Sequence, residues 1–389
     1  MIERTPIQAR PRRLRCLLVS PVAPPELRNG DSQYTEDLLR DPPEGVEYVT
    51  HEEAAANGEI EWGPSVRDGA TWRRPRDLPA ALARGGLGAA RRLGLLLSDP
   101  VSWIRVLAPF DVVHVHCTPV RFLGPRPPVL LSDSAGTFWY WTAGLGMDEG
   151  RVLRLLRRER ALARRIGYLH PTVHPAAERV VYFVESGIEL AARIGIDVSG
   201  ATICAPGVPS ARVDSRSDGR TLLFVARSFE VKGGPDALRV LARVRESLPD
   251  ARLIVAGSDP PASVPEGVEW LGPLSREQLY EEAYPRADVF VYPTRFDTTG
   301  FVVEEALAHG LPVVAPRALC LPDVVRHGET GYLQDPWDVD EAAATIVELL
   351  EDRDRHARLR AAARADFERR MSPGARNEVL GGLYRSLAP

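Results

Sequence analysis

The sequence predicts an α/β protein with two doubly wound, parallel-sheet domains that face each other across a cleft. Short apolar runs alternate with helical stretches along most of the chain, which is typical of parallel sheets covered by helices. The 389 residues exceed one typical core and suggest two domains of roughly 150 to 200 residues each. A polar stretch rich in turn-forming residues, 206–220, separates the two sets of apolar runs. Ligands bind in such folds at the carboxyl ends of the strands, which line the cleft.

Each predicted domain contains its own set of strands. We expect the first domain over residues 1–206, a linker at 207–219 and the second domain over residues 220–371. A helix at 374–387 is expected to return and pack on the first domain. The apolar runs predict strands in the first domain at 16–20, 46–50, 111–116, 128–132 and 179–186. In the second domain they predict strands at 221–226, 252–257, 268–272, 288–292 and 312–316.

The composition is that of an ordinary globular protein, with 44% hydrophobic and 26% charged residues. No run of 18 or more apolar residues occurs, so the sequence predicts no membrane-spanning helix. Prolines that follow the basic amino-terminal segment argue against a signal peptide. The cysteines lack the close spacing of metal sites and disulfide frameworks; they are Cys16, Cys117, Cys204 and Cys320. We therefore expect a cytoplasmic protein without a metal site.

The chain contains a single lysine, Lys232, in the segment ARSFEVKGGPDAL (226–238). The other 48 of its 49 basic residues are arginine. An arginine-biased genome drifts toward arginine wherever charge alone suffices, so a retained lysine indicates a site that needs a compact ammonium group. The alternative is that this lysine survives by chance.

The segment YPTRFDTTGFVVEEALAHGLPVVAP (292–316) predicts the end of a strand, a turn and a helix. Gly300 begins the predicted helix and Gly310 ends it. The first amides of a helix lack partners within the helix, and the helix dipole favours an anion there. We therefore expect free amides around Thr299, Gly300 and Phe301 to bind an anion such as a diphosphate.

Two acids lie eight positions apart in this segment, Asp297 on the turn and Glu305 on the helix. Such a pair can reach different hydroxyl groups of one elongated ligand. The alternative is that Asp297 caps the helix and that Glu305 is a half-buried structural acid.

Three segments resemble the nucleotide-sugar half of the retaining glycosyltransferases of family four, also described as glycosyl transferases group 1: 222–234, 297–315 and 321–338. The resemblance implies the GT-B fold and a nucleoside diphosphate sugar as donor, with no further cofactor. It implies that Arg227 and Lys232 bind the diphosphate. It assigns Asp297 to hydroxyls of the donor sugar and Glu305 to the ribose. The family has glutamate where this chain has Asp297, and often an aromatic residue where it has Thr299.

The implied reaction breaks a sugar–diphosphate bond, and preorganised cations stabilise the charge that the leaving group gains. Arg227 offers a planar fork to the phosphate oxygens and Lys232 a point charge, while Asp297 contacts the departing sugar. These groups predict a reaction without a divalent metal, and no Asp-x-Asp triplet is present to hold one. The resemblance also implies retention of configuration, and we nominate no covalent nucleophile.

The first half of the chain offers fewer candidates for the acceptor side. Gly30 lies after the first strand, where the family has a glycine loop that faces the diphosphate. His116 ends the strand at 111–116 and is either a residue of the cleft or a buried, hydrogen-bonded histidine. Asp133 follows the strand at 128–132, where the family commonly has a histidine, and is a substitute candidate for a general base.

A predicted helix at 151–167 carries seven arginines, with its apolar residues on the opposite side. Such a helix attracts an anionic membrane surface, and no motif accompanies it that would predict nucleic-acid binding. We expect a cytoplasmic, retaining glycosyltransferase, either free or peripheral at the inner face of the membrane. Its acceptor is a lipid-linked group, a growing glycan or a small soluble molecule. The alternative is a catalytically silent subunit that binds nucleotide sugars.

Overall fold

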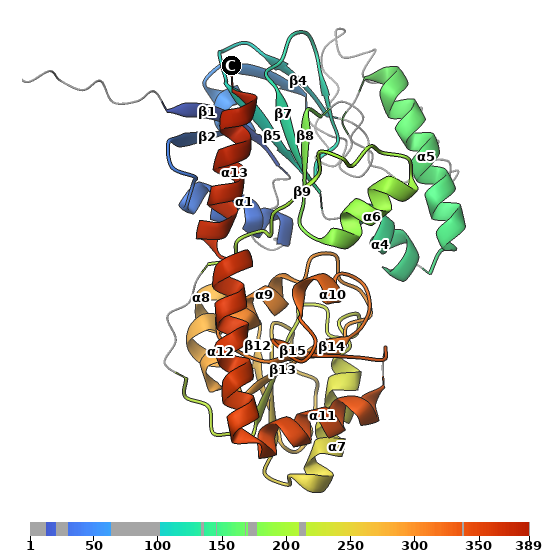
Figure 1. Cartoon of the computed structure of the whole chain (residues 1–389), viewed down its shortest axis with the longest axis vertical. Helices are drawn as coiled ribbons and strands as arrows, with labels where there is room; N and C mark the ends of the chain where they lie inside the picture. The colour runs from blue at the N-terminus through green and yellow to red at the C-terminus, as the bar shows by residue number, and fades with distance from the viewer. Residues whose placement is uncertain are drawn as a thin grey trace, which may run out of the picture.

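The structure is a computed structural model in which two α/β halves are stacked one above the other (Figure 1). It describes the following residues: 13–20, 30–63, 102–133, 136–144, 146–167, 169, 177–209, 215–336 and 338–388. A second basic segment of the sequence, 67–92, lies outside these residues, as does part of the predicted linker. The predicted domain boundaries stay predictions.

The upper half contains a six-stranded parallel sheet in the order β2-β1-β5-β7-β8-β9. Its strands are β1 (Leu14–Val19), β2 (Val46–Thr50), β5 (Val112–His116), β7 (Val129–Asp133), β8 (Arg179–Tyr182) and β9 (Thr202–Ile203). Its helices are α1 (Gly30–Arg40), α2 (His51–Ala56), α4 (Gly136–Trp139), α5 (Glu149–Ile166) and α6 (Glu185–Arg193), with the π-helix η4 (Tyr140–Gly144) after α4. The five strands predicted for this half are present, but the one predicted at 179–186 ends at Tyr182, and its last residues begin α6.

A second, three-stranded sheet was not predicted. It consists of β3 (Ile60–Gly63), β4 (Ser102–Val106) and β6 (Val120–Phe122), of which β3 and β4 are antiparallel. These strands are three to five residues long and mix polar with apolar residues. Short mixed runs carry little periodic signal, which explains why the sequence did not reveal them.

The lower half contains a second six-stranded parallel sheet, in the order β12-β11-β10-β13-β14-β15. Its strands are β10 (Thr221–Val225), β11 (Arg252–Ala256), β12 (Val268–Gly272), β13 (Val289–Val291), β14 (Val313–Pro316) and β15 (Gly331–Gln334). Its helices are α7 (Gly234–Ser247), α8 (Arg276–Gln278), α9 (Phe301–Ala308), α10 (Leu321–Val324), α11 (Val339–Glu351) and α12 (Arg353–Arg370), and η5 (Leu279–Ala283) and η6 (Tyr284–Arg286) follow α8. The five predicted strands are again confirmed.

Each large sheet has a point where the strand order reverses direction. In the upper sheet this point lies between β1 and β5, and in the lower sheet between β10 and β13. Loops that leave the carboxyl ends of two such strands diverge and open a crevice, where ligands bind in doubly wound folds. The candidates Gly30 and His116 border the upper switch point, and Lys232 and Asp297 border the lower one.

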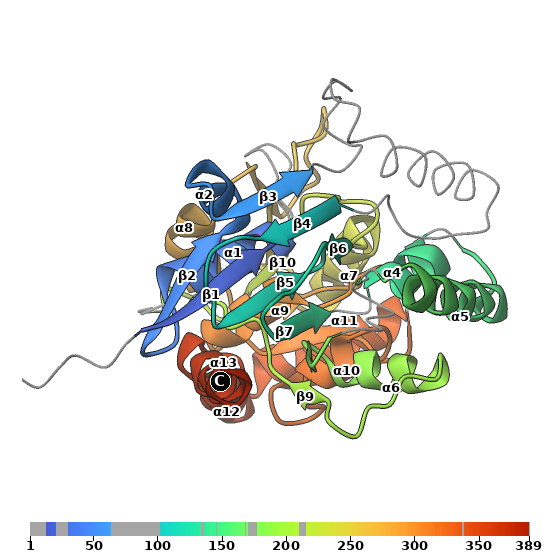
Figure 2. The same cartoon turned by 90° about the horizontal axis from the view of Figure 1, so that it is seen from above.

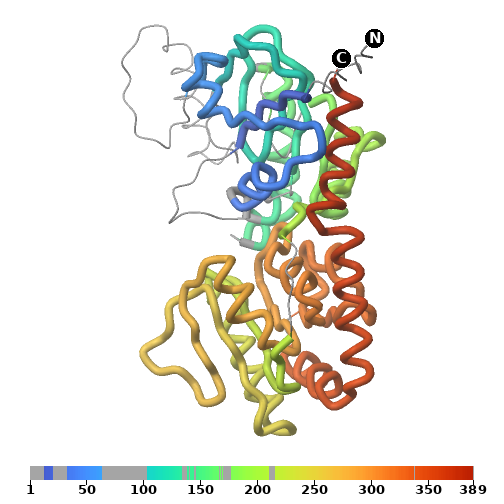
Figure 3. The backbone as a smooth tube through the Cα atoms, turned by 90° about the vertical axis from the view of Figure 1, so that its left-hand side faces the viewer, coloured from blue at the N-terminus to red at the C-terminus, as the bar shows by residue number. Residues whose placement is uncertain are grey.

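The last helix, α13 (Pro373–Leu387), returns to the upper half. Figures 1 and 2 show it beside the strands of the upper sheet, and Figure 3 shows α12 and α13 in succession along both halves. Tyr384 of α13 is buried, and its hydroxyl hydrogen-bonds to Nδ1 of His114 at 2.7 Å and to the hydroxyl of Tyr48 at 2.8 Å. Residues from the end of the described chain therefore complete the core of the upper half.

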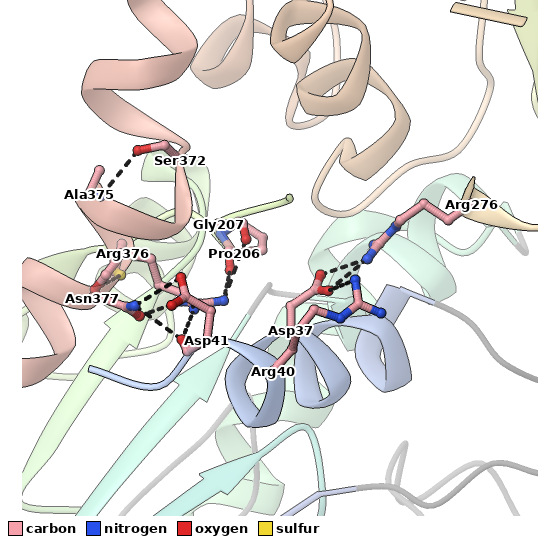
Figure 4. Close-up of polar contacts among 11 residues, drawn as sticks. Asp37, Arg40, Asp41, Pro206, Gly207, Arg276, Ser372, Ala375, Arg376 and Asn377 are labelled. Carbon is pink, nitrogen blue, oxygen red and sulfur yellow. Dashed lines mark hydrogen bonds and ion pairs between the residues drawn. The ribbon is translucent and has the colours of Figure 1, made fainter. Parts of the chain in front are cut away.

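The chain crosses between the halves at two places that lie side by side. The fully buried Arg376 of α13 donates from Nη1 to the carbonyls of Pro206 and Gly207, at 3.5 and 3.4 Å (Figure 4). It also donates from Nη2 to the carbonyl of Asp41, just after α1. One guanidinium thus joins the connection between the halves, the returning helix and the upper half.

Among the described helices, none is long and apolar enough to cross a membrane.

Candidate active site

The loop after β10 positions the lone lysine. Strand β10 is buried at every residue, and Arg227 is exposed two residues after its end. Gly233 has φ +83° and caps the start of α7, and a Cβ atom there would lie 1.9 Å from the carbonyl oxygen of Pro293. Only glycine allows this approach. Gly233 therefore brings the loop that contains Lys232 against the segment that follows β13.

Lys232 points at the turn that contains Asp297. Its Nζ donates to Oδ2 of Asp297 and to the carbonyl oxygen of Phe296, both at 2.8 Å. The rings of Tyr292 and Phe296 flank the ammonium, with Nζ 5.9 and 5.7 Å from their centroids. The lysine side chain keeps 24% of its surface exposed, so it still faces solvent where a ligand would enter. The structure therefore brings together two residues that the sequence placed 65 positions apart.

Asp297 is buried, and five donors saturate its carboxylate. Oδ1 accepts from the amides of Thr298, Thr299 and Gly300 at 2.7, 3.1 and 2.9 Å. Oδ2 accepts from Lys232 and from the hydroxyl of Tyr292 at 2.6 Å. Burial raises the pKa of Asp297, but the charge of Lys232 and these hydrogen bonds outweigh it and hold the pKa at about 2. The carboxylate is ionised and fixed in orientation.

The prediction of free amides around Thr299, Gly300 and Phe301 is therefore partly wrong. The amides of Thr299 and Gly300 are occupied by Asp297, because an aspartate before a helix folds back onto the next amides. Thr299 is buried, and Gly300 caps α9 with φ +82°. Phe301, half-buried, is the first residue of α9, where an amide lacks a partner within the helix. Asp297 thus holds the amides of the turn that precedes α9, but it does not cap the helix, because Gly300 is the cap residue and no described side chain bonds the first helical amides.

Glu305 is buried on α9, which Gly300 caps. Its Oε1 accepts from Nε of Arg276 at 2.9 Å, and its Oε2 accepts from the hydroxyl of Tyr284 at 2.9 Å. Burial raises the pKa of Glu305, and the charge of Arg276 opposes this increase. Neither Arg276 nor Tyr284 was expected at the site. No motif marks Arg276, since only its place after the helix cap Ser275 is visible in the sequence.

The acceptor-side candidates lie at the carboxyl edge of the upper sheet. Gly30 is the first residue of α1, and Asp133 is buried at the end of β7. His116 is fully buried: its Nδ1 lies 2.9 Å from Oγ of Ser132, and the ring of Tyr34 covers it at 4.5 Å between centroids. The structure therefore shows the buried alternative for His116. Ser132 also bonds His114, which links the histidine pair to Tyr384 of α13.

Comparison with known proteins supports the resemblance. Residues 219–352 match the family model described as glycosyl transferases group 1. A 149-residue stretch is 36% identical to the sulfoquinovosyl transferase SQD2 of Arabidopsis thaliana, covering 35% of this chain and 28% of that protein. A 178-residue stretch is 30% identical to a GDP-mannose-dependent alpha-(1-6)-phosphatidylinositol monomannoside mannosyltransferase of Mycobacterium tuberculosis, covering 40% and 46%. The chain thus spans less than half the length of these curated relatives.

The whole chain can also be compared with a solved structure. Anabaena HepE in complex with UDP-glucose superposes with a TM-score of 0.61 at 14% identity, covering 96% of this chain and all of that one. At this identity the likeness concerns the fold alone. Together with the two six-stranded parallel sheets, it confirms the predicted GT-B fold.

The low pKa of Asp297 predicts a pH-dependent contribution to stability. The folded pKa of about 2 lies below the ordinary value of 3.8, so the ionised group stabilises the fold above about pH 4 and this contribution is lost toward pH 2. Asp297→Asn should therefore lower the free energy of unfolding by about 2 kcal/mol at neutral pH, and the difference should shrink below about pH 4. Urea unfolding at a series of pH values measures this. Asp340→Asn, at an exposed surface pair with Arg243, is the control and should differ little at any pH. A deficit of Asp297→Asn that stays constant down to about pH 2 would contradict the assignment.

Proposed function

We propose that this chain, whose residues 219–352 belong to the glycosyl transferases group 1, transfers a sugar from a nucleoside diphosphate sugar to an acceptor. The observation that carries the proposal is the contact of Lys232 with Asp297 at the switch point of the lower sheet. The family resemblance assigns these two residues to the diphosphate and to the donor sugar. Their side chains are 2.8 Å apart, close enough to act on adjacent parts of one ligand.

The proposed chemistry depends on charge at the leaving group. As the bond between sugar and diphosphate breaks, negative charge grows on the diphosphate, and the Lys232 ammonium and Arg227 guanidinium stabilise it. Lys232 is fixed before the ligand arrives, because Asp297 and the Phe296 carbonyl already hold its Nζ. Preorganised charge of this kind requires little reorganisation during the reaction. The proposal therefore includes no divalent metal and no further cofactor.

Asp297 and Glu305 are proposed to bind different parts of the donor. Asp297 is proposed to accept from hydroxyls of the sugar, one of which takes the place of one of its five present donors, and Glu305 is proposed to accept from the ribose. Each acid is buried and has cationic or hydroxyl donors that orient it. The resemblance to retaining enzymes adds retention of configuration, with the acceptor attacking on the face that the leaving group vacates.

A membrane-bound acceptor is favoured by one surface of the upper half. Helix α5 exposes six arginines: Arg151, Arg154, Arg157, Arg158, Arg164 and Arg165. Its apolar residues are covered, because Val152, Leu156 and Ala163 pack with Phe138 and Leu190 in one buried cluster. The helix can therefore attract anionic headgroups without inserting into the bilayer. The Mycobacterium relative's name gives phosphatidylinositol monomannoside, a lipid, as what it acts on. We propose peripheral attachment to an anionic membrane surface on the cytoplasmic side.

The donor assignment can be tested by binding. Glu305→Gln should weaken both the free nucleoside diphosphate and the intact donor, because both contain the ribose. Asp297→Asn should spare the free nucleotide and weaken only the donor. Losing a charged hydrogen bond typically costs about 1.5 to 3 kcal/mol, which calorimetric titration with UDP, GDP and their glucose and mannose conjugates resolves. Equal losses of free nucleotide in both variants would contradict the assignment, and no binding of any of these ligands by the unaltered protein would refute the proposed function.

The lone lysine provides a test of the leaving-group role. Lys232→Arg should lose roughly a hundredfold in transfer or donor-hydrolysis rate. A guanidinium is larger than the ammonium, so between the Tyr292 and Phe296 rings either the guanidinium or the phosphate must shift by about 1 Å. Lys232→Ala should lose at least as much. Arg193→Lys, on the exposed end of α6, should leave the rate unchanged. Full activity of Lys232→Arg with an unchanged melting temperature would show that charge alone suffices.

The membrane proposal is tested by sedimentation with liposomes. Replacing Arg154, Arg157, Arg158, Arg164 and Arg165 with glutamine should abolish binding to vesicles of anionic phospholipid and leave donor hydrolysis nearly intact. Binding of the unaltered protein should weaken as salt rises, because screening acts over roughly 10 Å at 0.1 M. Vesicles of neutral phospholipid are the control. Unaltered binding by the five-fold variant, or no binding by the parent protein at low salt, would refute this role for α5.

A further inference from the structure

Arg276 connects the two halves of the molecule through one guanidinium (Figure 4). Its Nη1 donates to both carboxylate oxygens of Asp37, each at 2.8 Å, and Asp37 lies on α1 of the upper half. Its Nε donates to Oε1 of Glu305 at 2.9 Å, on α9 of the lower half. The side chain of Arg276 is 9% exposed and those of the two acids 4% each. A buried chain of charges therefore runs from α1 to the acid proposed to bind the ribose.

One nitrogen of the Arg276 guanidinium, Nη2, makes no hydrogen bond to the described residues. The nitrogen is also buried. Buried donors are nearly always paired, so this nitrogen can donate to an acceptor, water or ligand, that enters this place. Arg276 belongs to the same cluster as Glu305, so such an acceptor lies near the proposed ribose site.

Glu305 also retains capacity for a ligand. Its Oε1 accepts from Arg276 and its Oε2 from the hydroxyl of Tyr284. A carboxylate oxygen can accept two hydrogen bonds, and the Tyr280 hydroxyl also interacts with this carboxylate, so Glu305 retains capacity for at least one further donor. A hydroxyl of the ribose is such a donor. Arg276 can therefore stay in place when the nucleotide binds.

We propose that Arg276 is a positioning residue for the nucleotide: it holds the Glu305 carboxylate for the ribose while Asp37 of the opposite half holds Arg276. This inference rests on the proposed function, since it takes Glu305 as the ribose-binding acid. Helix α1 thereby completes a nucleotide site whose other residues belong to the lower half. Nη2 faces an acceptor oxygen that the bound nucleotide supplies.

The Arg276 cation is needed to keep the Glu305 carboxylate ionised. Burial raises the pKa of both Glu305 and Asp37, and Arg276 opposes the increase in each case. The charged and titratable groups around Glu305 are Arg276, Asp37, Tyr280, Tyr284, Glu304 and His309. Arg276 is the cation that contacts its carboxylate. Without it, Glu305 takes up a proton at higher pH, and a protonated carboxyl loses acceptor capacity that the ribose needs.

The test is the pH dependence of nucleotide binding. Calorimetric titration with UDP and GDP from about pH 6 to about pH 9 compares the parent protein with Arg276→Met, Arg276→Lys, Asp37→Asn and Arg40→Met. Arg276→Met should bind about tenfold or more weakly near neutral pH, and its affinity should recover as pH rises because Glu305 ionises. Arg276→Lys should restore part of the affinity and move the pH midpoint back. Asp37→Asn should weaken binding severalfold and should move the midpoint toward lower pH, opposite to Arg276→Met, because the charge of Asp37 raises the pKa of Glu305.

Arg40→Met is the matched control. Arg40 contacts the same Asp37, at 4.0 Å, but is 56% exposed and lies away from Glu305, so its loss should change neither affinity nor pH midpoint. Melting temperatures identify any variant that fails to fold, in which case Arg276→Lys and Asp37→Asn decide. Parent-like affinity and pH profile in folded Arg276 variants would overturn the inference and leave the proposed function intact. Failure of the parent protein to bind any nucleoside diphosphate would overturn both.

Discussion

The ion pair between Lys232 and Asp297 is the contact on which the lower site depends. It joins the loops that leave the sheet on either side of the switch point, and it forms only because Gly233 allows the backbone to approach Pro293. The same carboxylate accepts the amides of residues 298–300 and so sets the start of α9, the helix that carries Glu305. One buried acid therefore fixes the lysine, the helix start and, through the helix, the second acid. A ligand that enters meets charges whose positions are already determined.

The sequence revealed the parts of this arrangement that local patterns encode. The ten predicted strands are present because buried parallel strands are continuous apolar runs. Lys232, Asp297 and Glu305 were identified because each lies in a short segment with a family resemblance. What Asp297 contacts was only half predictable: its bonds to the amides of the turn are local, whereas its bond to Lys232 joins residues 65 positions apart. The expectation of free amides failed for Thr299 and Gly300 because Asp297 bonds these amides within the turn, and the alternative of a helix cap is not realised either, since α9 has no side-chain cap.

Long-range contacts explain the remaining omissions. Arg276 has no motif, and its partners lie 239 and 29 positions away, so only the folded chain shows that it belongs to the site. The surroundings of His116 likewise depend on a residue that is distant in the sequence. The sequence left His116 as either a residue of the cleft or a buried, hydrogen-bonded histidine. The Tyr34 ring from α1 covers it and decides for the buried alternative, and no local sequence pattern marks this contact.

The return of α13 has a consequence for the order in which the molecule is made. The buried Tyr384 bonds His114 and Tyr48, and Arg376 ties the same helix to Asp41, so the upper half receives part of its interior from residues 373–387. Residues 13–209 are synthesised first, but the upper half lacks part of its interior until α13 has been synthesised. The lower half, which emerges later, contains all the strands of its sheet by residue 334. Domains generally fold in the order of their synthesis. In this chain the half that emerges first is the last to be completed.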